Sequence, residues 1–104
     1  MKQNIFPTQM TRVIDHAAEI SARLQISART MAVSEKIIKV LGCSKWMVGK
    51  DPTGIACATI YISSLLTGER RTQRQIAAAA TTTEATIRAR CRELEKNLLF
   101  IIRL

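Results

Sequence analysis

The segment 72–98, TQRQIAAAATTTEATIRARCRELEKNL, most constrains the fold because it predicts two helices joined by a tight turn. Thr72 and Gln75 have the spacing of a capping box, which predicts the start of a short helix through the alanine run at 77–80. The three threonines that follow interrupt this helix, since β-branched hydroxyl residues favour caps and turns over helix interiors. The last of them, Thr83, is the predicted N-cap of the second helix.

The second predicted helix has two chemically different faces. Its apolar residues recur at helical spacing and share one side: Ile87, Cys91, Leu94 and Leu98. The opposite side carries Ala85, Arg88 and Arg92. A helix pair of this kind is typical of a helix-turn-helix, whose second helix enters the DNA major groove with its early residues toward base edges. The same pattern also fits a helical hairpin whose arginines are only a solvated surface, so both interpretations stay open on pattern alone.

Composition favours a helical domain with a polyanionic partner. At 104 residues the chain is long enough for one domain with a modest core, and its 47% hydrophobic residues include only 4% aromatic ones. Such a core of Ile, Leu, Val and Ala is typical of packed helices. The net charge is +8, with eight Lys and Arg residues in 1–50 and eight in 51–104, so a folded basic surface is favoured over a basic tail. Nucleic acid, ribosomal and membrane-surface roles all fit this charge.

The titratable residues form no recognisable catalytic or metal site. Cys43, Cys57 and Cys91 are far apart, without a CxxC pair, and are predicted to be reduced thiols in the core. His16 has no cysteine or carboxylate partner in view. The longest apolar run, Leu98–Ile102, is too short to span a membrane, and no signal peptide is visible. We therefore expect no enzyme activity, no metal, no cofactor and no membrane insertion.

Caps and glycines predict three further helices before the pair. Ser27 is the predicted N-cap of the second helix and Gly42 lies at its end. Asp51-Pro52 begins the third and Gly68 ends it; this segment is small or apolar nearly all round, which predicts a buried central helix. The full prediction is an all-α domain over 1–104 with helices at about 8–24, 27–42, 51–67, 72–80 and 83–99, and an apolar tail at 100–104.

Three connecting segments have individual predictions. Trp46 and Met47 are expected to fill the space between helices. The loop Glu69-Arg70-Arg71 is either placed for phosphate contact or simply solvated. The apolar tail is expected to dock on the core, the alternative being a surface that another chain covers.

The residues also resemble a known family. The run GKDPTGIACATIYISSLLTGERRTQRQIA, followed by TEATIRARCRELEKNL, resembles the second cyclin-fold repeat of archaeal transcription factor B and eukaryotic transcription factor IIB. The family pattern contains GK-x-P-x-GIA-AA-x-YIAS, then GE-x-RTQ-x-x-IA and TE-x-T-x-R, and the ISART stretch also resembles the family's second helix. The likeness spans about Phe6 to Leu98. It implies a five-helix cyclin-like domain whose last two helices form a helix-turn-helix.

The resemblance implies promoter binding at the B recognition element, just upstream of the TATA box. In the family an apolar residue and an arginine early in the recognition helix read bases, and here these positions are Ala85 and Arg88. An arginine can donate twice to guanine O6 and N7. The residues predicted to contact DNA phosphates are Arg70, Arg71, Thr72, Arg74, Thr83, Thr86, Arg90 and Arg92.

The resemblance also implies partners and a location. The implied partners are promoter double-stranded DNA, the TATA-binding protein and RNA polymerase within an initiation complex, and the protein is expected to be a monomer. Its expected location is the cytoplasm or nucleoid of an archaeon, or the nucleus of a eukaryote. The family's zinc ribbon and first repeat are not in this chain, so we expect an excised domain or a naturally short relative that binds DNA weakly by itself. The alternative function is a cyclin-like protein-interaction module without base-specific DNA binding.

Three residues depart from the family pattern. Ala85 is smaller than the usual valine, which weakens the expected apolar contact with bases. The family turn is commonly Ala-Gly-Val-Thr, whereas this chain has Ala80-Thr81-Thr82-Thr83. If Thr81 adopts a positive φ, its β-branched side chain costs roughly 1 kcal/mol or more. Thr82 puts a hydroxyl where an apolar side chain usually packs.

Overall fold

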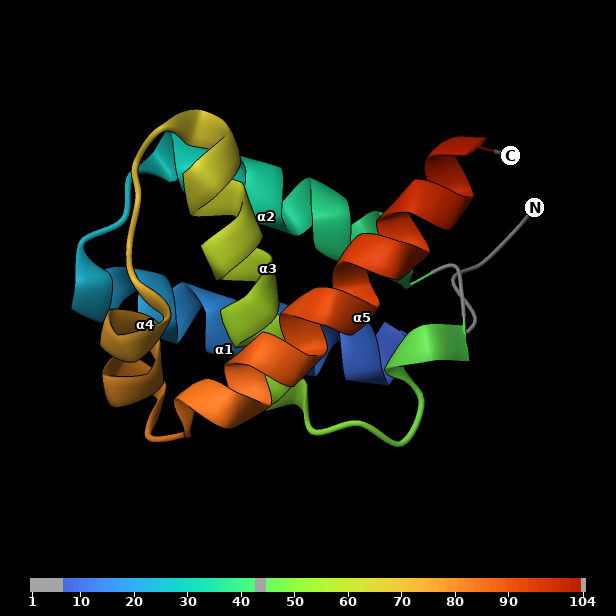
Figure 1. Ribbon diagram of the computed structural model, residues 1–104, viewed down its shortest axis with the longest axis horizontal. Coiled ribbons are helices and arrows are strands. Elements are labelled where there is room, and N and C mark those ends of the chain that lie inside the picture. The colour runs from blue at the N-terminus through green and yellow to red at the C-terminus, as the bar shows by residue number, and fades with distance from the viewer. Residues whose placement is uncertain (1–6, 43–44, 104) are drawn as a thin grey trace.

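A computed structural model describes residues 7–42 and 45–103, and the surroundings of side chains for 8–42 and 45–98. Its regular structure within these residues is entirely helical (Figure 1). The helices are α1 Pro7–Leu24, α2 Ala28–Leu41, the short 3-10 helix η1 Lys45–Met47, α3 Pro52–Thr67, α4 Gln73–Ala80 and α5 Glu84–Arg103. The predicted all-α class with five α-helices is confirmed within the described residues.

Helix α3 is the centre around which the other helices pack. It contacts α1, α2, α4 and α5, and Figure 1 shows α5 crossing in front of it with α1 behind. The side chains of residues 55–60 are completely buried, as the uniformly apolar and small sequence predicts. Gly54 allows a close approach to α5, because a Cβ there would lie 3.3 Å from Cγ of Arg90. Helix α5 therefore rests directly on the core helix.

The predicted helix starts are confirmed by hydrogen bonds. The side chains of Ser27, Asp51 and Thr72 each accept from a backbone N–H in the first turn that follows, and Thr72 completes a capping box with Gln75. Gly68 ends α3 in the left-handed conformation with φ 78°. Gly42 also ends its helix, but with φ −65°, so its conformational freedom is not used there.

The core combines apolar side chains of α1 and α2 with several buried polar residues, of which Ser34 is one. Val13 and Ala17 of α1 are fully buried, as are Ile38 and Leu41 of α2. Ser34, which interrupts the stripe of α2, is also buried, and its hydroxyl donates to the backbone oxygen one turn earlier at 3.2 Å. A satisfied hydroxyl of this size is tolerated among apolar side chains.

The two predicted plugs differ in depth. Met47 is completely buried, whereas Trp46 is only partly buried and has the ammonium group of Lys50 5.1 Å from its ring centroid. The side-chain amide of Gln9 donates to the backbone oxygens of Met47 at 3.2 Å and Lys50 at 2.8 Å, which fastens this connection to α1.

The end of the last helix differs from the prediction. Helix α5 runs to Arg103 rather than ending near residue 99, so the backbone of 100–103 is helical and is not an irregular tail. No proline or glycine follows Glu84, and nothing in this segment therefore stops a helix. The expected docking of the tail side chains, the segment 1–6 and Cys43 lie outside the described residues.

Candidate nucleic-acid interface

The turn between α4 and α5 is closed by backbone hydrogen bonds at a strained threonine. The N–H of Thr81 donates to the Ala78 oxygen at 3.4 Å, and the N–H of Thr82 donates to the Ala77 oxygen at 3.0 Å. Thr81 has φ 58° and ψ 48°, so the condition under which strain is expected at this residue is met. A β-branched residue in this region costs about 1–2 kcal/mol relative to a right-handed conformation.

Helix α5 begins at a threonine cap. Oγ1 of Thr83 accepts from the N–H of Thr86 at 3.1 Å and also lies 2.9 Å from the hydroxyl of Thr86. The methyl group of Thr86 faces α3, 3.5 Å from where a Cβ on Gly54 would be. The Thr83 hydroxyl therefore serves primarily to start the helix.

The two faces of α5 are separated as the spacing predicts. Ile87 and Leu94 are completely buried and Cys91 is 6% exposed. Ala85 and Arg88 are exposed on the opposite side, near the start of the helix. The two residues predicted to read bases thus lie together on a solvent-facing surface.

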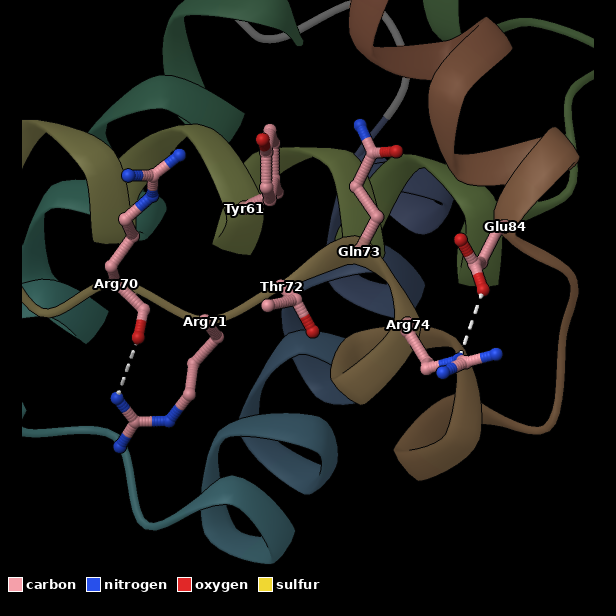
Figure 2. A pocket seen from close by; sticks show the side chains of 7 residues that line it. All are labelled: Tyr61, Arg70, Arg71, Thr72, Gln73, Arg74 and Glu84. Atoms are coloured by element: carbon pink, nitrogen blue, oxygen red, sulfur yellow. Dashed lines mark hydrogen bonds and ion pairs between the residues drawn. The ribbon is translucent and has the colours of Figure 1, made fainter.

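An acidic side chain lies within this basic surface. Oε2 of Glu84 is 3.6 Å from Nε of Arg74 on α4, and its Oε1 is 4.0 Å from Nη2 of Arg88 (Figure 2 draws the Arg74 pair). Arg74 is 86% exposed and Arg88 is 49% exposed, so neither guanidinium is enclosed. Exposed pairs of this kind are worth about 0–1 kcal/mol, which leaves both arginines available to a stronger acceptor.

In the charged loop 69–71, Glu69 and Arg71 make internal hydrogen bonds, whereas the side chain of Arg70 is exposed. The carboxylate of Glu69 accepts from the Ser27 N–H at 2.9 Å, from the Ser27 hydroxyl at 2.7 Å and from the Thr30 hydroxyl. The Thr30 hydrogen bond, with those from Ser27, lowers the pKa of Glu69. Arg71 donates to the Leu24 oxygen at 3.1 Å, which joins the loop to the end of α1.

A pocket of about 280 Å³ lies between α3, the α3–α4 connection and the start of α5 (Figure 2). Its lining side chains are Tyr61, Arg70, Arg71, Thr72, Gln73, Arg74 and Glu84. Sequence reasoning did not single out Tyr61 or Gln73, since a tyrosine in an apolar helix and a glutamine after a cap carry no distinctive signal. The pocket forms only when α3, the loop that follows it and the start of α5 lie side by side.

The structure divides the predicted phosphate contacts by their surroundings. Exposed members are Arg70, Thr72, Arg74, Thr83 and Arg92. Three others make internal contacts: Arg71 bonds to α1, Thr86 faces Gly54, and Arg90 pairs with Glu93 at 2.5 Å while its side chain packs on α3. Residues two positions apart on a helix point about 160° away from each other, so Arg90 faces away from Arg88 and toward α3.

The thiols of the described residues, Cys57 and Cys91, are free and buried. Burial raises the pKa values of Cys57 and Cys91 to about 12, with smaller contributions from neighbouring acidic groups. In the part of the chain that the structure describes, no three His, Cys, Asp or Glu side chains are grouped so that they could hold a metal ion. Among the same residues, no helix has the length and hydropathy needed to cross a bilayer.

Comparison with known proteins identifies close relatives of this domain. A family model described as the transcription factor TFIIB repeat matches residues 7–97. Transcription initiation factor IIB 1 of Thermoplasma volcanium is 41% identical over 98 residues, covering 94% of this chain and 30% of that relative. Transcription initiation factor IIB of Sulfurisphaera tokodaii is 44% identical over 84 residues, covering 81% of this chain and 27% of that relative. The corresponding factor of Methanopyrus kandleri is 42% identical over 84 residues.

This chain spans less than a third of the length of these relatives. It therefore matches a single repeat of a larger factor. The relatives are transcription initiation factors from archaea, a class of proteins that is not enzymatic.

Proposed function

Because the chain belongs to the transcription factor TFIIB repeat family, we propose that α4 and α5 bind promoter DNA at the B recognition element upstream of the TATA box. Helix α5 enters the major groove with Ala85 and Arg88 toward the base edges. Arg88 donates to guanine, and Ala85 makes a small apolar contact. This proposal concerns the domain alone, since the chain covers only part of its relatives.

The observation that carries the proposal is the exposure of Ala85 and Arg88 on one face of α5 while Ile87 is buried on the other. A recognition helix needs both properties: one face holds it rigidly on the core and the other is free to approach bases. The ion pair between Arg88 and Glu84 spans 4.0 Å at an exposed site. Its worth of about 0–1 kcal/mol is smaller than the 1–3 kcal/mol of discrimination that a bidentate contact with guanine supplies.

Exposed arginines on α4, on α5 and in the loop before α4 supply the phosphate contacts. Arg74 on α4 and Arg92 on α5 flank the base-reading residues, and Arg70 extends from the loop before α4. Thr72 and Thr83 lie at the starts of the two helices, where backbone amides favour an anion. Each phosphate neutralised should contribute roughly 0.9 to the slope of log affinity against log salt concentration.

The partners follow from the same proposal. We propose that the domain acts as a monomer on DNA, within an assembly containing the TATA-binding protein and RNA polymerase, and is located with the genome in the nucleoid or nucleus. A single repeat forms few of the contacts that such an assembly shares among linked domains. Its own DNA affinity should therefore be low.

Fluorescence anisotropy on two labelled duplexes tests the proposal. One duplex carries a purine-rich B recognition element beside a TATA box, and the other has that element scrambled. Preference for the intact element should fall by about 5- to 150-fold in Arg88→Ala, corresponding to 1–3 kcal/mol. The matched control is Arg12→Ala, an equal charge change at an exposed position of α1.

The outcomes separate base reading from the other functions. The control variant should keep the preference of the unmodified chain. Equal and strongly salt-dependent binding to both duplexes would reduce the function to a basic surface. Absence of binding to either duplex would favour the protein-interaction module, and the TATA-binding protein would then be added as the ligand.

A further inference from the structure

We infer that the pocket beside the α3–α4 connection holds one phosphate group of the DNA backbone, with Arg70, Tyr61 and Gln73 as the donors. This inference rests on the proposed function, because it assigns a specific binding site to the strand that α5 reads. It adds two residues, Tyr61 and Gln73, to the interface. Both lie outside the base-reading helix.

The three side chains come from different segments and extend in the same direction. Tyr61 lies on α3, Arg70 in the connection, and Gln73 at the first residue of α4. Figure 2 shows all three on one side of the connection, while the side chain of Arg71 extends to the opposite side. The pocket of about 280 Å³ thus has a donor-lined side formed by Arg70, Tyr61 and Gln73.

The hydrogen-bonding state of the lining residues distinguishes binding groups from structural ones. The side chain of Arg71 is already bonded to backbone oxygens, and Thr72 is bonded to Gln75. By contrast, the structure gives no partner within the described residues to the hydroxyl of Tyr61, the side-chain amide of Gln73 or the guanidinium of Arg70. Tyr61 and Gln73 are also partly buried, where polar groups without internal partners gain most from a ligand.

The charge and donor types indicate a phosphate rather than a neutral ligand. Three arginines and one glutamate line the pocket, and the glutamate is shared with arginines on α4 and α5. A guanidinium, a phenol and an amide can donate together to the several oxygens of one tetrahedral anion. A pocket of this volume has room for a phosphate group and the sugar atoms next to it.

The position of the pocket connects it to the base-reading face. Glu84 lies at the edge of the pocket and in the first turn of α5, and it is also the residue paired with Arg88. A DNA strand whose bases face Arg88 therefore passes the mouth of the pocket. Fixing one of its phosphates there would set the depth and register of α5 in the groove.

Gln73→Glu tests the pocket with little effect on folding. Position 73 is the first residue of α4, where a negative charge is favourable to the helix. The matched control is Gln75→Glu, which makes the same charge change two residues away and preserves the capping box. We expect Gln73→Glu to weaken binding to the intact duplex about tenfold more than Gln75→Glu, because the carboxylate would face the phosphate.

A phosphate scan identifies the ligand directly. Single methylphosphonates, which remove one backbone charge, are placed in turn along the intact duplex and measured against the unmodified chain, Arg70→Ala and Tyr61→Phe. At one position in the duplex, the methylphosphonate should weaken binding of the unmodified chain. At that same position it should weaken binding of Arg70→Ala and of Tyr61→Phe little further. Arg70→Ala should also reduce the salt slope by roughly 0.9.

Each outcome decides a different claim. If the effect of each methylphosphonate simply adds to the effect of each variant, no phosphate is held in the pocket and the inference is overturned. If base preference is intact at the same time, the proposed function still stands. Absence of DNA binding by the unmodified chain would overturn both. If Gln73→Glu left DNA binding unchanged but abolished binding of an acidic peptide, the pocket would be a protein-docking site instead.

Discussion

Oε1 of Glu84 lies 4.0 Å from Nη2 of Arg88, one turn apart on the exposed face of α5. The carboxylate at the start of the recognition helix thus pairs with the arginine proposed to read guanine. The second oxygen of the same carboxylate reaches Arg74 on α4 at 3.6 Å, so one acid connects both helices of the pair. In the unbound domain this acid keeps a negative charge on the surface proposed to meet DNA.

Glu84→Gln should bind every duplex more tightly and discriminate less between them. Its carboxylate repels phosphates and pairs with Arg74, so removing the charge favours non-specific binding most. We expect a several-fold gain on the scrambled duplex in the anisotropy measurement and a smaller gain on the intact one. Glu95→Gln, an equal charge change at an exposed position later on α5, is the control. An identical gain for the two variants on both duplexes would count against a special role for Glu84.

Thr81→Gly should stabilise the domain. Relief of the left-handed strain is worth about 1–2 kcal/mol, and the greater freedom of glycine in the unfolded chain offsets about 0.5–1 kcal/mol of it. The expected net gain in the free energy of unfolding is therefore about 0.5–1 kcal/mol, measured by urea denaturation. Thr82→Gly makes the same substitution at a position whose φ is not positive, and it should destabilise instead. A loss of stability in Thr81→Gly would contradict the strain argument.

Because of the hydrogen bonds to Glu69, the free energy of unfolding should decrease at low pH. The pKa of Glu69 is lowered from its usual 4.5 by the hydroxyls of Thr30 and Ser27. The ionised carboxylate therefore stabilises the fold above the unfolded-state pKa, and this contribution is lost as the pH falls through the lower folded-state value. Thermal unfolding of the unmodified chain and Glu69→Gln should differ most near neutral pH and converge in strong acid. A difference that persists unchanged in acid would argue against an ionised Glu69.

The buried thiols should be unreactive in the folded protein. Burial raises the pKa values of Cys57 and Cys91 to about 12 from the usual 9.0, so little thiolate forms at neutral pH. Below about pH 9 both thiols are neutral in the folded and in the unfolded state. Their contribution to the stability of the fold is lost only as the pH rises toward about 12. In a Cys43→Ser background, a thiol reagent should label neither residue until urea unfolds the chain. Rapid labelling without denaturant would contradict the described packing.

Local sequence signals were sufficient to predict most of the helices of the fold. Each predicted N-cap has a short polar side chain and is followed by apolar residues at helical spacing, as at Ser27, Asp51 and Thr72. Such caps can be recognised from neighbouring residues in the chain alone. The central position of α3 followed from its composition alone. The end of α5 was misplaced because its terminal residues carry no stop signal and differ from the preceding turns mainly in hydropathy.

The site could be predicted only in part, because several of its side chains have partners far away in the sequence. Arg71 was assigned to DNA, yet its guanidinium bonds to the Leu24 oxygen, 47 residues earlier. The sequence left open whether the loop that contains Glu69 contacts phosphate or is solvated, and its carboxylate is bonded to Ser27 and Thr30. Neither contact has a periodicity or motif that reveals it. The exposed face of α5 was predictable because its partners are the residues of its own helix.

Base reading by Arg88 can be tested by measuring the energetic coupling between that residue and single guanines. Each guanine of the B recognition element is replaced in turn by 7-deazaguanine, which lacks the N7 acceptor, and each duplex is titrated with the unmodified chain and with Arg88→Ala. At one guanine the two changes should be non-additive, with a coupling energy of about 1–3 kcal/mol. Additive effects at every guanine would contradict base reading by Arg88.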